Sequence, residues 1–256
     1  MKLGSELPSL EVIVSRYEIL EQVDMGVVEK RKMNDNLEAS RTTIDRSVRE
    51  LEAANVLERR NGSCEFTRYG RIVYEEFRET VKAAEKVKPA SELLAMLPPN
   101  SPIGATIANA DAVEMAPERA PVTALEDLGI PPDCNTIRAS LPVVFSQQLQ
   151  AIRDYAKGGT TLEILTHPDL VSLIQRRYPE VCELLDRSSS GIHSASELPE
   201  FGLIVYGSEE VRVCVYEGMS QLSGVLQNQD ADAVSEAISI FEENKRVAEP
   251  AFEVEA

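Results

Sequence analysis

The feature that most constrains the fold is an Asn-Gly pair between two short runs that favour β-structure. The runs span residues 56–60 and 64–67, and they flank Asn61, Gly62 and Ser63. Asn and Gly tolerate the positive φ angles of a tight turn, so this pair between β runs is a strong hairpin signal. The sequence therefore predicts a two-stranded hairpin whose tip consists of these three residues.

Three helices are predicted before the hairpin. Apolar residues recur at helical spacing over residues 8–25, with Gly26 as a stop, and a short second helix is expected over 28–38. Ser40 is a good N-cap for a third helix over 41–54. The apolar side chains of the third helix recur at helical spacing and form a stripe that packs on a core; they are Ile44, Val48 and Leu51.

A fourth helix is predicted after the hairpin, over residues 68–88, with Thr67 as its N-cap and Pro89 as its stop. One apolar stripe runs along this helix and consists of Ile72, Val73, Phe77, Val81 and Ala84. A small helical core covers only part of a stripe about 20 Å long, so the remainder needs a partner. We expect a second copy of the same helix, and hence a homodimer; the C-terminal part of the chain is the alternative partner.

Three short helices, a hairpin and a trailing helix form the order of a winged helix-turn-helix, in which the third helix and the hairpin meet DNA together. Every cationic residue between positions 38 and 70 is an arginine. The sequence therefore predicts a surface for double-stranded DNA; a helical face with ordinary solvated arginines is the alternative. The residues expected on this surface are Arg41, Thr42, Asp45, Arg46 and Arg49 on the third helix, and Arg60, Asn61 and Ser63 on the hairpin.

A second domain is predicted to follow. Residues 98–136 are rich in proline and predict a connector with a small strand at 111–115 and a short helix at 122–129. After the connector, strands alternate with helices and then form a hairpin, which favours an α/β sheet of mixed direction. The expected strands are 137–144, 160–166, 201–207, 211–217 and 223–228, and the expected helices are 146–157, 168–187 with Pro179 as a potential break, and 230–247 with Asp230 as its cap. The chain is thus expected to be an α+β protein with domains at 1–88 and 89–256.

Two strand ends in the second domain form a candidate effector site. Ser140 lies near the end of the first expected strand, and His167 lies at the end of the second. If these strands are parallel neighbours, their carboxyl ends open onto one crevice, where α/β sheets bind small molecules. Arg138 adds a positive charge there if it faces the same side. We expect a small polar or anionic effector, with a purely structural His167 as the alternative.

The sequence contains no recognised signature of catalysis or of a cofactor. The patterns GxGxxG, GxxxxGK(S/T) and GxSxG are absent. The four cysteines have no CxxC spacing and are expected to be free thiols rather than metal ligands; they are Cys64, Cys134, Cys182 and Cys214. No apolar run approaches about 18 residues, and the N-terminus lacks the pattern of a signal peptide. We therefore expect a cytoplasmic protein without a membrane span, a metal or a cofactor.

Charge is distributed unevenly along the chain. Residues 1–88 hold 16 Lys and Arg against 17 Asp and Glu, whereas residues 89–256 hold 10 against 26. The formal net charge is −17, and only 8 of the cationic residues are lysines against 18 arginines. Dispersed acidity with scarce lysine is typical of proteins that work in concentrated salt; an ordinary acidic protein is the alternative. At about 1 M salt the Debye length is about 3 Å, so this acidity does not prevent an approach to DNA.

Residues 37–71, LEASRTTIDRSVRELEAANVLERRNGSCEFTRYGR, resemble the winged helix-turn-helix core of archaeal transcription regulators. The segment that follows, from ELLAMLPP at residue 92 onwards, resembles the sensor-like domain of the archaeal family described for a methanogenesis regulator, a family common in haloarchaea. The resemblance implies DNA-facing positions on the third helix at Arg41, Thr42, Thr43, Asp45 and Arg46. The acidic Asp45 is a departure among these positions, and we expect it either to contact a cytosine amine or to orient Arg46.

This sensor-like domain is similar to phospholipase-D-like effector domains, and the resemblance implies that fold without its catalysis. The catalytic pattern HxKxxxxD is missing, since Pro168 and Asp169 follow His167, and Ser194 and Ala195 follow His193. The function expected is that of a homodimeric DNA-binding transcription regulator with an effector-sensing C-terminal domain. Two alternatives stay open, namely a C-terminal domain that docks a protein partner and a hydrolase of the phospholipase-D type.

Overall fold

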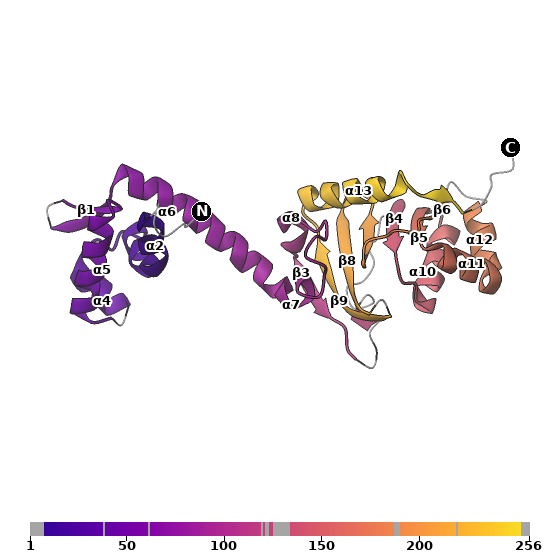
Figure 1. Ribbon diagram of the computed structural model, residues 1–256, viewed down its shortest axis with the longest axis horizontal. Helices are drawn as coiled ribbons and strands as arrows, with labels where there is room; N and C mark the ends of the chain where they lie inside the picture. Colours follow the sequence, from indigo (N-terminus) through magenta and orange to yellow (C-terminus); the bar gives the residue numbers. More distant parts are fainter. Residues whose placement is uncertain are drawn as a thin grey trace. The chain divides into compact units, whose positions relative to one another are not determined.

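The computed structural model describes residues 8–37, 39–60, 62–118, 120, 123–124, 134–186, 190–218 and 220–251. It separates the chain into two compact units, Met1–Ala84 and Glu85–Ala256, whose helices and strands are labelled in Figure 1. The division falls within the helix expected over 68–88. In the part of the chain that is described, every helix is too short or too polar to span a bilayer.

The first unit contains the expected order of helices, hairpin and trailing helix. Its elements are α2 (Pro8–Ser15), α3 (Tyr17–Asp24), α4 (Lys30–Asn36), α5 (Arg41–Ala53), β1 (Leu57–Arg60), β2 (Ser63–Phe66) and α6 (Arg68–Val87). The expectation of one continuous helix over 8–25 is wrong, because the backbone leaves the helical region at Arg16, with φ −124° and ψ 22°. No glycine or proline marks this break, and the Arg16 side chain reaches Glu50 of α5.

Local side-chain chemistry sets the ends of these elements. Ser40 Oγ accepts a hydrogen bond from the Thr43 backbone N–H at 3.1 Å and caps α5. Gly62, at the hairpin tip, has a φ of +87°, a conformation that glycine adopts without a steric penalty. The Gly70 backbone N–H donates to Thr67 Oγ1 at 2.9 Å, so Thr67 caps α6 as expected.

Helix α6 packs on the first unit through Gly70 and Tyr74. A Cβ at position 70 would lie 1.9 Å from the carbonyl oxygen of Val56, so glycine is required for this close approach. Tyr74 is 1% exposed, and its ring centroid lies 5.1 Å from that of Phe66 in the hairpin. The core covers only part of the apolar stripe of α6, since Ile72 is 46% exposed.

The second unit is built on an eight-stranded sheet in the order β10-β6-β5-β4-β7-β8-β9-β3. Its strands are β3 (Ala112–Met115), β4 (Thr136–Leu141), β5 (Thr161–Thr166), β6 (Gly191–Ser194), β7 (Phe201–Tyr206), β8 (Glu210–Glu217), β9 (Gln221–Asn228) and β10 (Glu249–Pro250). Strands β4, β5 and β6 run parallel, and the other pairs are antiparallel. The predicted α+β architecture with a mixed sheet is confirmed.

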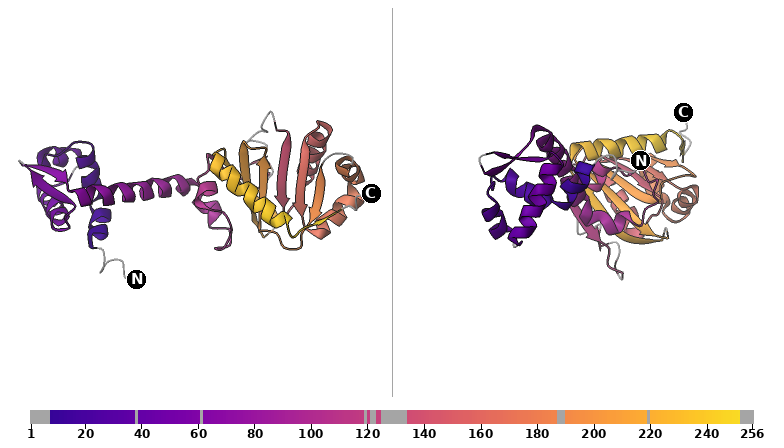
Figure 2. Two further views of the ribbon diagram at one scale, coloured as in Figure 1. Left: turned by 90° about the horizontal axis from the view of Figure 1, so that it is seen from above. Right: turned by 60° about the vertical axis from the view of Figure 1, so that its left-hand side comes forward.

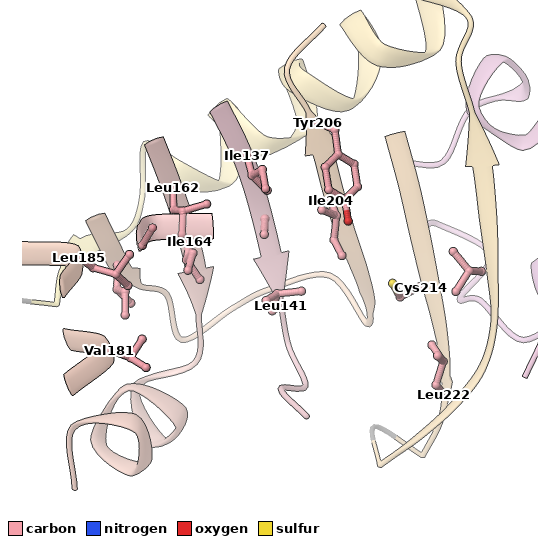
Figure 3. Close-up of a cluster of buried hydrophobic side chains, with 14 of the residues drawn as sticks. Ile137, Leu141, Leu162, Ile164, Val181, Leu185, Ile204, Tyr206, Cys214 and Leu222 are labelled. Carbon is pink, nitrogen blue, oxygen red and sulfur yellow. The ribbon is translucent and has the colours of Figure 1, made fainter. Parts of the chain in front are cut away.

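Helices cover both faces of this sheet. Helix α13 (Ala231–Lys245), yellow in Figure 2, lies across one face and buries Phe241 against strand residues such as Val213. Helices α10 (Ser146–Lys157), α11 (Pro168–Arg177) and α12 (Pro179–Asp186) pack on the opposite face. Figure 3 shows this second core, in which Leu185 of α12 packs with Leu162 and Ile164 of β5. The mixed sheet is therefore buried on both faces, as its long apolar strands require.

Some parts of the second unit differ from expectation. The strand expected over 137–144 ends at Leu141, just before Pro142, which has no N–H for a ladder. The helix expected over 168–187 is divided at Tyr178, and Pro179 begins a new helix at the break that the sequence indicates. The elements η1 (Lys88–Ala90), α7 (Ser91–Leu94), α8 (Ala105–Ala108), β6 and β10 were not predicted. The helix expected at 122–129 lies largely outside the described residues.

Candidate functional site

The outer face of α5 carries the helix residues that are predicted to contact DNA. Arg41, Thr42, Thr43, Arg46 and Arg49 are exposed, and Asp45 is half-buried. The opposite face of α5 is buried and consists of Ile44, Ser47, Val48 and Leu51. The outer face is hollowed over a volume of about 490 Å³, lined by Thr42, Asp45, Arg46, Arg49, Glu50 and Ala53. Burial of the apolar stripe thus leaves a polar, arginine-rich face turned outward.

Glu50 joins two arginines on this face. Arg46 Nε donates a hydrogen bond to Glu50 Oε1 at 2.9 Å, and Arg16 Nε donates to Glu50 Oε2 at 2.8 Å. These bonds, the one from Arg46 first, hold the pKa of the Glu50 carboxyl below its usual range. The Arg46 side chain is nevertheless 77% exposed, so its outer end faces solvent.

The hairpin presents two further arginines. Arg59 Nε lies 2.6 Å from Glu52 Oε1 of α5, and Arg60 Nη2 lies 2.8 Å from Glu58 Oε1 on its own strand. Arg60 is one of the residues predicted to contact DNA. Arg59 was not singled out, since the strand pattern does not show which hairpin arginine lies beside the third helix. Its ion pair with Glu52 connects the hairpin to α5.

The hairpin is fixed to the helices that precede it. Ser63, another predicted contact, is half-buried and pairs with Arg60 across the hairpin. Beside it, the Cys64 backbone N–H donates to the Val28 carbonyl at 3.0 Å, in the segment before α4. The predicted contact Asn61 lies outside the described residues. The hairpin is therefore anchored near its tip, which gives its arginines a defined position relative to α5.

In the second unit, the structure brings the two expected strand ends together. Strands β4 and β5 are parallel neighbours, and Ser140 pairs with Leu165, two residues before His167. Ser140 is 1% exposed, and its Oγ has no hydrogen-bond partner in the described part of the chain. His167 is the N-cap of α11, where its Nδ1 accepts from the Asp169 backbone N–H at 3.3 Å. His167 thus has a structural contact of its own.

Arg138 lies on β4 two residues before Ser140, so the two share a face of the strand. Arg138 Nε is 3.2 Å from Glu163 Oε2 of β5 and 3.6 Å from Glu242 Oε1 of α13. Lys245 of α13 also pairs with Glu163. The charge of Arg138 is therefore balanced by carboxylates beneath α13, and it lies inside the sheet rather than at the strand end.

A buried polar cluster on β8 was not predicted as a feature of the fold. Arg212 Nε donates to Glu210 Oε1 at 2.6 Å, and the guanidinium lies 4.8 Å from the Tyr206 ring centroid. Gln227 and Gln229 donate to Glu210 Oε2 at 2.6 and 3.0 Å. Arg212 is 2% exposed. The sequence signal is two opposite charges two residues apart in an apolar strand, which places both on one face.

The four cysteines are free thiols in the structure. Burial raises the pKa of Cys214 to about 12, so this thiol stays protonated at neutral pH. Among the residues that the structure describes, no three His, Cys, Asp or Glu side chains are grouped so that they could hold a metal ion.

Three solved structures resemble the chain distantly. TrmBL2, described as an archaeal chromatin protein with a novel mode of DNA binding, is 12% identical over 97% of each chain, with a TM-score of 0.44. Nuc from Salmonella typhimurium, a phospholipase D family member, is 10% identical over 54% of this chain and 95% of its own, with a TM-score of 0.39. NucT from Helicobacter pylori is 12% identical over 54% and 97%, with a TM-score of 0.40. No curated protein matches the chain.

Two family models match the chain. The model described as the HVO_A0261 N-terminal domain matches residues 6–88, which include α5 and the hairpin. The model described as the middle domain of the methanogenesis regulatory protein FilR1 matches residues 120–246, which include strands β4 to β9 and α13. The chain therefore combines an N-terminal domain of the HVO_A0261 type with a middle domain of the FilR1 type.

Proposed function

We propose that this chain is a transcription regulator that binds double-stranded DNA with the outer face of α5. The observation that carries the proposal is the gathering of Arg41, Arg46 and Arg49 on one exposed helix face. In a winged helix this face enters the major groove. An arginine that donates two hydrogen bonds to a guanine discriminates against other bases by about 1–3 kcal/mol. Three arginines on one face therefore supply enough interaction energy for sequence preference.

The hairpin arginines contribute contacts that do not depend on sequence. Arg59 and Arg60 are paired with Glu52 and Glu58, but the two arginine side chains are 47% and 64% exposed. Exposed ion pairs are weak and are screened by salt, so a phosphate can replace the carboxylate. Each phosphate contact releases counterions, and binding then weakens as salt concentration rises.

The regulator acts as a homodimer through α6. Tyr69 and Ile72 of this helix are 41% and 46% exposed, although large apolar side chains are normally buried. A two-fold pair of α6 helices would cover them and place two recognition helices at successive major grooves, about 34 Å apart. Two half-sites then act together through effective concentration. This matters in concentrated salt, where phosphate attraction alone holds a single domain weakly.

The second unit senses a small effector at the ends of β4 and β5. The support is the Ser140 hydroxyl, which is buried without a hydrogen-bond partner among the described residues, beside the strand that ends at His167. A buried hydroxyl that lacks a partner is costly unless a ligand or water satisfies it. Ser140 and His167 together suit a small polar metabolite, whereas the charge of Arg138 is already balanced by Glu163 and Glu242. A thermal-shift panel of metabolites tests this site, since His167→Ala should lose the shift that the wild type shows.

Selection of bound sequences from a random duplex pool tests the proposed function. The full-length protein should enrich a two-fold symmetric sequence at high salt. The variant in which Arg41, Arg46 and Arg49 are all alanine should enrich none, while it keeps the circular dichroism spectrum of the wild type. If the wild type enriches no sequence, or if the triple variant enriches the same sequence, the proposed function is wrong.

A further inference from the structure

We propose that Glu50 is a positioning residue that orients Arg46 toward a guanine. The three linked side chains of Arg16, Glu50 and Arg46 then set the sequence preference. This inference rests on the proposed function and assigns a role within the same DNA-binding face. It concerns a carboxylate on α5 that bridges Arg46 of the outer face to Arg16, which lies between α2 and α3.

The first observation is that both carboxylate oxygens of Glu50 are occupied. Oε2 is 2.8 Å from both Nε and Nη2 of Arg16. Oε1 accepts from Arg46 Nε at 2.9 Å. Because the two oxygens are held by different arginines, the carboxylate cannot rotate without breaking one of these contacts. The direction in which Glu50 presents Oε1 to Arg46 is therefore fixed by Arg16.

The second observation is that the exposed fraction of the side chain increases from Arg16 through Glu50 to Arg46. The side chains of Arg16 and Glu50 are 28% and 33% exposed, whereas that of Arg46 is 77% exposed. Arg16 thus lies partly inside the unit, whereas Arg46, which is proposed to contact the base, lies in solvent. Arg16 has a non-helical backbone between α2 and α3, and from this position its side chain reaches Glu50 of α5. This gives the unpredicted break between these helices a role in recognition.

The third observation is which nitrogen of Arg46 is engaged. A guanidinium carries five N–H donors in a planar fork. Glu50 engages Nε, which leaves the edge formed by Nη1 and Nη2 for another partner. This edge can donate to both O6 and N7 of guanine in the major groove. Holding Arg46 in this orientation before binding also reduces the rotamer entropy that is lost on binding.

Two simpler roles for Glu50 make different predictions. If the pair only stabilises the unit, removing the charge lowers the unfolding temperature and leaves base preference unchanged. If Glu50 only repels phosphates, removing the charge raises the affinity for every duplex by the same factor. A positioning residue instead changes the preference at one base pair. The ratio of affinities for duplexes that differ at this base pair is therefore the deciding measurement.

The experiment uses full-length protein and the duplex enriched from the random pool. Arg46→Ala first identifies the base pair at which guanine preference depends on Arg46. Glu50→Gln and Arg16→Gln are then titrated against the four duplexes that differ at this base pair. Both variants should lower the preference for guanine by at least about threefold, out of the roughly fivefold or more that one arginine contact supplies. Affinity for an unrelated duplex should stay the same or rise.

Glu52→Gln is the matched control, because it removes the same charge from α5 but releases Arg59 instead. It should leave the guanine preference unchanged. Arg16→Gln leaves α5 itself unaltered, so it serves as the second variant if Glu50→Gln does not fold. Wild-type guanine preference in either folded variant, or an equal loss in Glu52→Gln, would overturn the role of Glu50 while the proposed function stands. If the wild type itself enriches no sequence, the proposed function fails, and this inference fails with it.

Discussion

Replacing Gly70 by alanine tests how α6 is held against the hairpin. The added Cβ would lie 1.9 Å from the Val56 carbonyl oxygen and 2.6 Å from the Val56 carbonyl carbon. An ordinary contact begins at 3.4 Å, so α6 and the backbone at Val56, just before β1, would have to separate by more than 1 Å. Both clashing groups are backbone, and no change of rotamer relieves the contact. The same carbonyl accepts a hydrogen bond from the Thr67 backbone N–H at 3.0 Å, which the separation would strain.

The Gly70→Ala substitution has two effects of opposite sign on the stability of the first unit. Alanine is the better helix former by about 1 kcal/mol, which favours the substitution. Overpacking of a fitted contact costs about 1–3 kcal/mol, and a clash between two backbones lies at the upper end of that range. The separation also moves Tyr74 away from Phe66, whose rings lie 5.1 Å apart. We therefore expect a net loss of about 2 kcal/mol in the unfolding free energy of the first unit.

Amide hydrogen exchange at high salt measures this loss where it occurs, in α6 and in the hairpin. Ala83→Gly, at an exposed position of the same helix, is the control and should lose only about 1 kcal/mol. Exchange in the second unit should not change in either variant. A Gly70→Ala protein that is as stable as the wild type, or more stable, would refute the argument that a backbone contact requires glycine.

Three further predictions concern the buried Arg212–Glu210 pair, the hairpin and the α6 helix. Glu210→Gln removes the carboxylate partner of Arg212, which is 2% exposed, and should lower the unfolding free energy measured in urea by about 3–5 kcal/mol. The exposed control Glu209→Gln should lower it by less than about 0.5 kcal/mol, and equal losses would contradict the buried pair. Arg60→Ala should weaken binding to all duplexes alike and reduce the slope of log K against log salt by about one; an unchanged slope argues against a phosphate contact. Ile72→Glu changes an exposed residue of α6, whereas Phe77 packs against Tyr17 within the first unit; the Ile72→Glu variant should give a folded monomer in light scattering at high salt that no longer binds the selected duplex, and a wild-type monomer would disprove the dimer.

The parts of the fold that follow local chemistry could be predicted from the sequence. Ser40 and Thr67 cap helices because their hydroxyls accept backbone N–H groups, which requires no knowledge of distant residues. Gly62 marks the hairpin tip because its positive φ is also a local property, which glycine adopts without a steric penalty. Short continuous apolar runs also predicted most strands of the mixed sheet, because a strand buried on both faces needs continuous apolar residues.

Features that depend on distant partners could not be predicted. The break at Arg16 has no local signal, and its side chain is engaged by Glu50, 34 positions further along the chain. Gly70 looks like an ordinary helix residue until Val56 is placed against it. In the candidate site, the stripe of Ile44, Val48 and Leu51 predicted which face of α5 turns outward, whereas the contact of Glu50 with Arg16 joins residues 34 positions apart and has no local signal.

The central claim is that the exposed arginines of α5 bind DNA. It is tested most directly by titrating the selected duplex, at high salt, with the full-length wild type and with the variant in which Arg41, Arg46 and Arg49 are alanine. Loss of at least two base contacts, at about 1–3 kcal/mol each, predicts an affinity at least about 30-fold lower. The variant should keep the unfolding transition of the wild type, because all three side chains are exposed. An affinity within about twofold of the wild type would contradict the account.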